Sequence, residues 1–225
     1  MPVAARYHAA MVAEFPDMPR PAAVVLDIGN VLIDWQPEIF FDRHMPADAR
    51  ARMFEEADLH GMNLRIDRGA DLHATVMAKA AQHPRWAPMI RLWHDRWLEM
   101  ASPAITGSVR LMAALRRRGV PVFALSNFGI APFEIARRAY PFLDAFDRRW
   151  ISGHLGLVKP EPEIYARLEA DSGIAPERLL FTDDRADNIA AARARGWQTH
   201  LFTTPQNLAG HLRAAGLLTE EETRR

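Results

Sequence analysis

The stretch VVLDIGNVLIDW, residues 24–35, joins an apolar run to a turn that carries a carboxylate. Val24, Val25 and Leu26 have the β-branched and apolar character of a buried strand. Asp27 follows where that strand should end, and the Gly29-Asn30 pair then turns the chain. Because a buried carboxylate is costly unless something compensates its charge, Asp27 indicates a functional site.

From residue 102 onward, apolar runs alternate with helical patterns. Strands are predicted at residues 120–127, 179–184 and 198–204, and helices at residues 108–119, 160–173, 186–196 and 205–216, the first with Ser108 as its N-cap. Apolar strands separated by helices indicate a parallel sheet covered on both faces. The sequence therefore predicts an α/β fold with a Rossmann-like, three-layer core.

Residues 37–101 interrupt this alternation with four segments of helical spacing and no convincing strand. Their Met, Trp and Phe stripes are typical of a small helical core. We therefore expect a core formed by residues 21–36 and 102–225, a helical insert at 37–101, and an N-terminal extension at 1–20.

The composition is that of an ordinary soluble globular protein. Of 225 residues, 49% are hydrophobic and 25% charged, and 28 basic residues balance 28 acidic ones. This balance gives no long-range attraction to nucleic acid or to an anionic membrane. The chain has no cysteine, which excludes disulfides and thiolate chemistry, and the first twenty residues do not resemble a signal peptide. The expected location is cytoplasmic.

Three carboxylates crowd the turn after the strand at 179–184: Asp183, Asp184 and Asp187. Adjacent acids after a strand often form only a turn or a helix cap. Here Asp27 ends a strand that can lie next to theirs, and clustered carboxylates repel one another unless a cation relieves them. Hard oxygen ligands without cysteine favour Mg²⁺.

Two further strand-end segments carry polar groups suited to phosphate. Ser126-Asn127 offers a hydroxyl and loop amides at the end of its strand. Lys159 precedes Pro160, which favours an extended backbone at a junction between loop and helix. A single lysine is usually a solvated surface charge, but this junction can direct the ammonium group to the acidic cluster.

Together these segments resemble the four ordered motifs of the haloacid dehalogenase superfamily. The matching stretches are VVLDIGNVL with Asp27, ALSN with Ser126, GLVKPEPEIY with Lys159, and FTDDRADN with Asp183 and Asp184. The resemblance covers about residues 22–205, and the helical insert lies where this family carries a type 1 cap. Within the family, the sequence is most similar to bacterial sugar-phosphate phosphatases of the glucose-1-phosphate type.

The resemblance implies a phosphatase that works through a covalent aspartyl-phosphate on Asp27. It implies Mg²⁺ held by Asp27, the Gly29 carbonyl and Asp184, with Asp183 nearby. Ser126 and Lys159 would bind the phosphoryl oxygens, and Asn127 would shape the loop. Asp187 and Asn188 are interpreted as groups that cap the helix or orient Asp184. The expected partner is a small phosphorylated metabolite, and the protein is expected to be a monomer or homodimer.

The sequence departs from the family at Gly29, where most of its phosphatases place a second aspartate as general acid and base. Conceivable substitutes are Asp34, His60, His73 and His94. The cap offers Arg43, His44, His60, Asn63, Arg65, Asp67 and Arg68 for substrate selection, and Trp35 fits either a hinge or the wall of the site.

Two alternatives remain. A 2-haloacid dehalogenase also lacks the second aspartate and needs no metal, but an acidic pair such as Asp183-Asp184 is costly without a cation. A catalytically idle fold that binds a phosphorylated ligand or a partner protein has only Gly29 in its favour.

Overall fold

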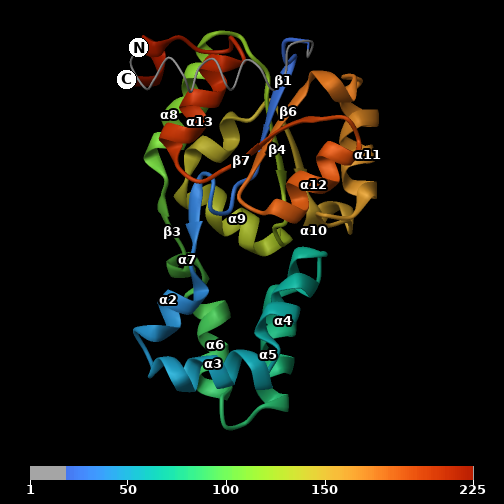
Figure 1. Ribbon diagram of the computed structural model, residues 1–225. Coiled ribbons are helices and arrows are strands. Elements are labelled where there is room, and N and C mark those ends of the chain that lie inside the picture. The colour runs from blue at the N-terminus through green and yellow to red at the C-terminus, as the bar shows by residue number, and fades with distance from the viewer. Residues whose placement is uncertain (1–18, 225) are drawn as a thin grey trace.

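A five-stranded parallel sheet forms the centre of the molecule (Figure 1). The computed structural model describes residues 19–224, so nearly all of the predicted N-terminal extension lies outside the described residues. Across the sheet, the strands are β5 (Arg148–Ile151), β4 (Val122–Ser126), β1 (Ala23–Leu26), β6 (Leu179–Asp183) and β7 (Gln198–Leu201). The predicted α/β fold with a parallel sheet is confirmed.

Strand β1 lies at the middle of the sheet, where both of its edges and both of its faces are covered. Leu26 pairs with Ala124 of β4 on one side and with Thr182 of β6 on the other. Val24 and Leu26 belong to one buried apolar cluster, and Val25 belongs to a second cluster on the opposite face. This two-sided burial explains why the strand is a continuous apolar run.

Helices cover the two faces of the sheet. On one face lie α8 (Thr106–Arg117), α9 (Ile130–Ala139) and α13 (Pro205–Ala214), and on the other α11 (Pro162–Ser172) and α12 (Ala186–Ala194) (Figure 1). The shorter elements of this part are η1 (Pro141–Ala145), α10 (Ser152–Leu155), η2 (Pro176–Arg178) and α14 (Glu220–Arg224).

A helical lobe, residues 37–100, projects from the sheet (Figure 1). It consists of α2 (Pro37–Asp42), α3 (Ala47–Glu56), α4 (Leu59–Asp67), α5 (Leu72–Gln82), α6 (Ala87–Asp95) and α7 (Trp97–Met100). Its apolar stripes do form a small core, in which Phe41, Met53 and Trp93 are fully buried. The boundaries of an independent cap domain stay a prediction.

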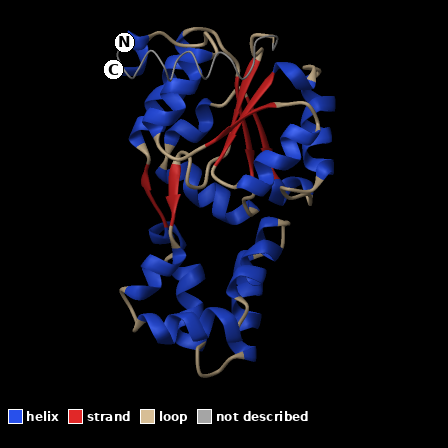
Figure 2. Ribbon diagram, viewed as in Figure 1, coloured by secondary structure: helices blue, strands red, loops and turns tan. Residues whose placement is uncertain are grey.

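The sequence did not reveal the two-stranded connection between this lobe and the sheet. Strand β2 (Ile33–Trp35) pairs antiparallel with β3 (Ala101–Ala104), and Figure 2 shows this ribbon as a separate pair of short strands. Each strand is too short to carry a readable alternation of apolar and polar residues.

Two local predictions were wrong or incomplete. Ser108 does not cap a helix, because α8 begins at Thr106 and Ser108 is buried inside it. Strand β5 was missed because it is an edge strand that opens with the exposed Arg148 and Arg149. Within residues 19–224, no helix combines the length and apolar character needed to cross a membrane.

Candidate active site

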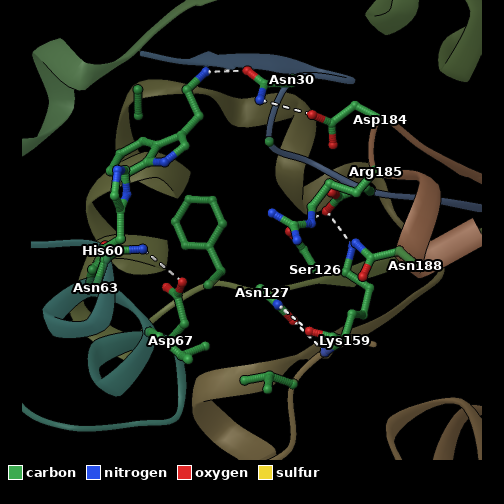
Figure 3. Close-up of a pocket in the computed structure, with 18 of the residues that line it drawn as sticks. Asn30, His60, Asn63, Asp67, Ser126, Asn127, Lys159, Asp184, Arg185 and Asn188 are labelled. Atoms are coloured by element: carbon green, nitrogen blue, oxygen red, sulfur yellow. Dashed lines mark hydrogen bonds and ion pairs between the residues drawn. The ribbon is translucent and has the colours of Figure 1, made fainter. Parts of the chain in front are cut away.

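A cavity of about 710 Å³ lies between the carboxyl ends of the central strands and the helical lobe. From the strand ends and their loops it is lined by Asp27, Gly29, Asn30, Ser126, Asn127, Lys159, Asp184 and Asn188, among others. Helix α4 contributes His60, Asn63, Leu64 and Asp67 (Figure 3). Four sequence segments far apart in the chain therefore meet in one place, as expected at the carboxyl edge of a parallel sheet.

Asp27 ends β1 as a buried carboxylate with one oxygen fully engaged. Its Oδ1 accepts hydrogen bonds from Ser126 Oγ at 2.6 Å and from the Ile28 amide at 2.7 Å, and lies 2.9 Å from Lys159 Nζ. Burial raises the pKa of Asp27 to about 7, although the Lys159 charge opposes this. Its Oδ2 accepts no hydrogen bond from the described residues, so it is the oxygen free to react or to ligate.

Lys159 is a buried cation held between two carboxylates. Its Nζ lies 2.6 Å from Asp183 Oδ2 as well as 2.9 Å from Asp27 Oδ1. Burial alone lowers the pKa of Lys159, but Asp27 and Asp183 outweigh that effect and hold it above its usual range. The ammonium group therefore stays charged and ties the ends of β1 and β6 together.

Asn127 positions the Lys159 loop through a pair of reciprocal hydrogen bonds. Its Nδ2 donates to the Lys159 carbonyl at 2.9 Å, and its Oδ1 accepts from the Lys159 amide at 2.8 Å (Figure 3). Both polar atoms of the side chain are therefore engaged in holding the Lys159 loop.

The adjacent acids Asp183 and Asp184 have different surroundings. Asp183 is fully buried, and Lys159, Asn188 and the Arg185 amide between them engage both of its oxygens. Asp184 is only partly buried and lines the cavity. Burial raises the pKa of Asp184, and a hydrogen bond from Asn30 at 3.0 Å opposes the shift.

These acids fit a metal ion by position and chemistry. Asp27, Asp183 and Asp184 each offer an oxygen, and the three atoms lie within 4.8 Å of one another. Asp183 is already engaged, so Asp27 and Asp184 are the carboxylates free to act as direct ligands. Two carboxylates beside a phosphate site are the usual protein contribution to Mg²⁺ binding.

Asp187 and Asn188, interpreted as groups that cap the helix or orient Asp184, form no hydrogen bond with Asp184 in the described part of the chain, and Asp187 accepts one from the Asn188 amide in the first turn of α12. The Asn188 side chain donates a hydrogen bond to Asp183. Asp187 forms an exposed ion pair with Arg185, in which Asp187 Oδ2 lies 2.6 Å from Arg185 Nη2. Asp184 is oriented by Asn30, which also accepts a hydrogen bond from the Trp35 amide at 2.9 Å. Asn30 has a positive φ of 53°, a conformation that asparagine tolerates better than most residues.

Some of the candidate residues that the sequence offered in the helical insert line the cavity, and others do not. His60, Asn63, Asp67 and Arg68 line it, whereas Arg43, His44 and Arg65 do not. Of the conceivable substitutes for the absent acid, His60 lines the cavity, and Asp34, His73 and His94 do not.

Sequence reasoning missed two features of the cavity. One is that Trp93 and Trp97 extend the wall for which Trp35 was already a candidate, with ring centroids 6.0 and 5.7 Å from that of Trp35. The other is the buried position of Asp67. Burial raises the pKa of this carboxyl group to about 7. The spacing of Asn63 and Asp67, four residues apart on one helix face, was the available signal for a shared polar site.

The whole motif set matches a family model. Residues 21–196 match the haloacid dehalogenase-like hydrolase model, which covers most of the chain, so this chain belongs to that family.

Two curated phosphatases resemble part of the chain. A D-ribitol-5-phosphate phosphatase of Bacteroides thetaiotaomicron is 33% identical over 91 residues, which cover 37% of this chain and 43% of that protein. A sesquiterpene phosphatase of Aspergillus oryzae is 29% identical over 86 residues, covering 38% and 44% of the respective chains. The chain thus spans less than half the length of these relatives.

Solved structures share the fold over most of the chain. A haloacid dehalogenase family enzyme from B. thetaiotaomicron matches with a TM-score of 0.67 at 21% identity, over 83% of this chain and 95% of that one. The same enzyme in complex with magnesium and inorganic phosphate matches with a TM-score of 0.63 at 22% identity, over 81% and 94%. The L-2-haloacid dehalogenase of Xanthobacter autotrophicus matches with a TM-score of 0.58 at 19% identity, over 91% and 87%.

Replacing Lys159 by methionine is expected to destabilise the metal-free protein in a pH-dependent way. The substitution leaves Asp27 and Asp183 buried without their cation, which typically costs about 3–5 kcal/mol. Loss of the Lys159 charge raises the pKa of Asp27 further, so the lost stability is regained as pH falls and this carboxylate takes up a proton. Melting temperatures of wild type and K159M in chelator, at pH 5 and pH 8, measure this.

The matched control is K79M, which replaces the only other lysine of the chain. The Lys79 side chain is also buried, but it forms no ion pair with the described residues. An equal loss at both pH values for K159M would contradict the charge explanation.

Proposed function

We propose that this protein is a Mg²⁺-dependent phosphatase that hydrolyses a small phosphomonoester through an aspartyl-phosphate. The observation that carries the proposal is the set of three clustered carboxylates, with a single buried ammonium against two of them. This set has an excess of negative charge that a divalent cation would balance, and the resulting cation pair suits a phosphoryl group.

Each residue has a role that its contacts support. Asp27 Oδ2, free of hydrogen bonds from the described residues, attacks phosphorus and forms the covalent intermediate. Ser126 Oγ and Lys159 Nζ, both beside Asp27 Oδ1, bind the phosphoryl oxygens once the substrate enters. When bound, Mg²⁺ supplies positive charge to the phosphoryl oxygens, with Asp27, Asp184 and the Gly29 carbonyl as ligands.

Dehalogenation of a 2-haloacid is the second candidate. The fold resembles that of an L-2-haloacid dehalogenase, and that reaction also begins with an aspartate nucleophile. The argument against it is electrostatic: Asp184 adds a third carboxylate to a pair that shares a single lysine. Release of halide from 2-chloropropionate in the presence of chelator would favour this candidate, and an idle fold would have neither activity.

The substrate is proposed to be a sugar or polyol phosphate. The cavity volume of about 710 Å³ suits a small metabolite, and one of the relatives acts on D-ribitol 5-phosphate. Polar groups of α4, including Asn63, line the cavity together with aromatic rings, so a substrate can form hydrogen bonds with the polar groups and pack on the rings. A panel that also contains a prenyl monophosphate tests this, since another relative is a sesquiterpene phosphatase.

Replacing Asp27 by asparagine should abolish phosphatase turnover while the fold is kept. The amide is nearly isosteric and retains an oxygen for Ser126, but it is a poor nucleophile. Acid-quenched mass spectrometry should detect a phosphorylated Asp27 in the wild type and none in D27N. The control is D34N, seven residues further on and outside the cavity. Turnover by D27N near the wild-type rate would contradict a covalent mechanism on this residue.

Magnesium should stabilise the metal-free protein, and Asp184 should matter far more for this effect than Asp187. A ligand that binds only the folded state raises its stability by mass action. Melting temperatures across a Mg²⁺ titration are expected to rise for wild type and for D187N, whose side chain is exposed and paired with Arg185, but much less for D184N. Equal responses from D184N and D187N, or full activity in excess chelator, would rule out this metal site.

A further inference from the structure

The position where related phosphatases carry a second aspartate holds Gly29, and the structure gives no steric reason for a glycine there. A Cβ added at Gly29 would meet only the Trp35 Cβ, at 3.9 Å, and its φ lies outside the left-handed region. A side chain could therefore begin at this position, but this chain has none there. Departure of an alcohol from a phosphomonoester still benefits from a proton donor, typically by about 10²- to 10⁴-fold.

Asp67 is the carboxyl group that the helical lobe directs into the cavity. It is the last residue of α4, and its side chain faces the same space as Ser126 and Lys159 (Figure 3). Its Oδ2 accepts a hydrogen bond from Asn63 Nδ2 at 2.8 Å, and the Gly129 main chain lowers the pKa of the carboxyl group. The carboxyl group is thus oriented by the lobe, next to the main chain of the core.

The main chain around Asp67 is attached directly to the core of the protein. The Asp67 carbonyl accepts a hydrogen bond from Ser152 Oγ at 2.6 Å, and Arg68 forms an ion pair with Glu161. Gly69, with a φ of 104°, approaches the Gly153 carbonyl so closely that a Cβ would lie 2.6 Å from that oxygen. These contacts fix the end of α4 relative to Asp27, as a catalytic side chain requires.

We propose that Asp67 is the general acid and base of this active site, in place of the carboxyl group absent at Gly29. The proposal rests on the phosphatase function proposed above. In the first step, Asp27 attacks phosphorus, the P–O bond to the organic group breaks, and Asp67 gives its proton to the departing oxygen. In the second step, Asp67 takes a proton from the water that attacks the aspartyl-phosphate, which restores both carboxyl groups to their starting states.

The electrostatic surroundings of Asp67 favour this role. Burial is the main cause that raises the pKa of Asp67 to about 7, and the Asp27 charge adds to it, while the Gly129 amide and Lys159 oppose it. The other ionisable groups of the cavity are His60 and Arg68 on the lobe, and Glu161, Asp184 and Arg185 on the core, where Glu161 pairs with Arg68. A carboxyl group that titrates near neutral pH can both donate and accept a proton there.

His60 is the competing donor, and its contacts place it less well. Its Nε2 lies 3.2 Å from Glu38, and 69% of its side chain is exposed to solvent. It therefore sits at the rim of the cavity with a partner outside it. Asp67 lies deeper and is held by Asn63.

The decisive experiment follows both chemical steps in D67N, using the full chain with Mg²⁺. Substrates with poor and good leaving groups, an alkyl phosphate and p-nitrophenyl phosphate, separate the two roles. For the alkyl phosphate, kcat/KM is expected to fall by about 10²- to 10⁴-fold. For p-nitrophenyl phosphate, which needs no proton on its leaving group, D67N is expected to release one rapid equivalent of nitrophenol and then accumulate phosphorylated Asp27.

The pH profile gives an independent readout. A general acid must be protonated, so kcat/KM of the wild type for the alkyl phosphate should fall as pH rises through the pKa of Asp67. That limb should be absent in D67N. The matched control is D58N, at the other end of α4: Asp58 caps the helix with a φ of 46°, and asparagine can both cap and adopt that conformation.

A rescue variant keeps the assignment separate from a folding defect. G29D in the D67N background returns a carboxyl group to the site from the core side, and recovery of alkyl phosphate turnover supports the assignment. Alkyl phosphate rates in D67N within about threefold of wild type would overturn it while leaving the phosphatase function intact. A wild type that forms no phosphorylated Asp27 would overturn both.

Discussion

The buried ammonium group of Lys159 is the constraint on which the site depends. It lies within 3 Å of carboxylate oxygens from two different strands, Asp27 at the end of β1 and Asp183 at the end of β6. Without it, the middle of the sheet would end in two uncompensated buried charges, which is a strongly destabilising arrangement. The same charge that allows these strands to end in carboxylates also makes the site attractive to a phosphoryl group.

The helical lobe is tied to the core at the end of α4, next to the residues with which it lines the cavity. Ser152 Oγ donates to the Asp67 carbonyl and accepts from the Phe128 amide at 2.8 Å, so a single hydroxyl links the lobe to the loop after β4. The Arg68–Glu161 pair forms a second link, to the segment that follows Lys159. The role proposed for Asp67 therefore depends on the contacts that hold the lobe against the core.

The fold and the part of the site that lies on the core could be predicted from the sequence, because both depend on local signals. Apolar strands and amphipathic helices have readable periods, and polar residues at strand ends must meet at one edge of a parallel sheet. The β2–β3 ribbon and the edge strand β5 lacked such periods and were missed.

The contribution of the helical lobe was harder to predict for another reason. His60, Asn63 and Arg65 lie on one helix, but which of them reaches the cavity depends on the rotation of α4 against the core. That rotation is fixed by long-range contacts such as the Ser152–Asp67 hydrogen bond, and no local pattern in the sequence encodes it.

Three asparagine side chains hold the charged groups of the site in place without adding charge themselves. Asn30 joins the β1 loop to Asp184, Asn188 holds Asp183 from α12, and Asn127 clamps the backbone of Lys159. At Asn127 the clamp requires a donor and an acceptor on one short side chain, so an aspartate would lose one hydrogen bond and add a fourth carboxylate. Neutral amides fix the geometry and leave the balance between the carboxylates and their cations unchanged. That balance determines the affinity of the site for a phosphoryl group.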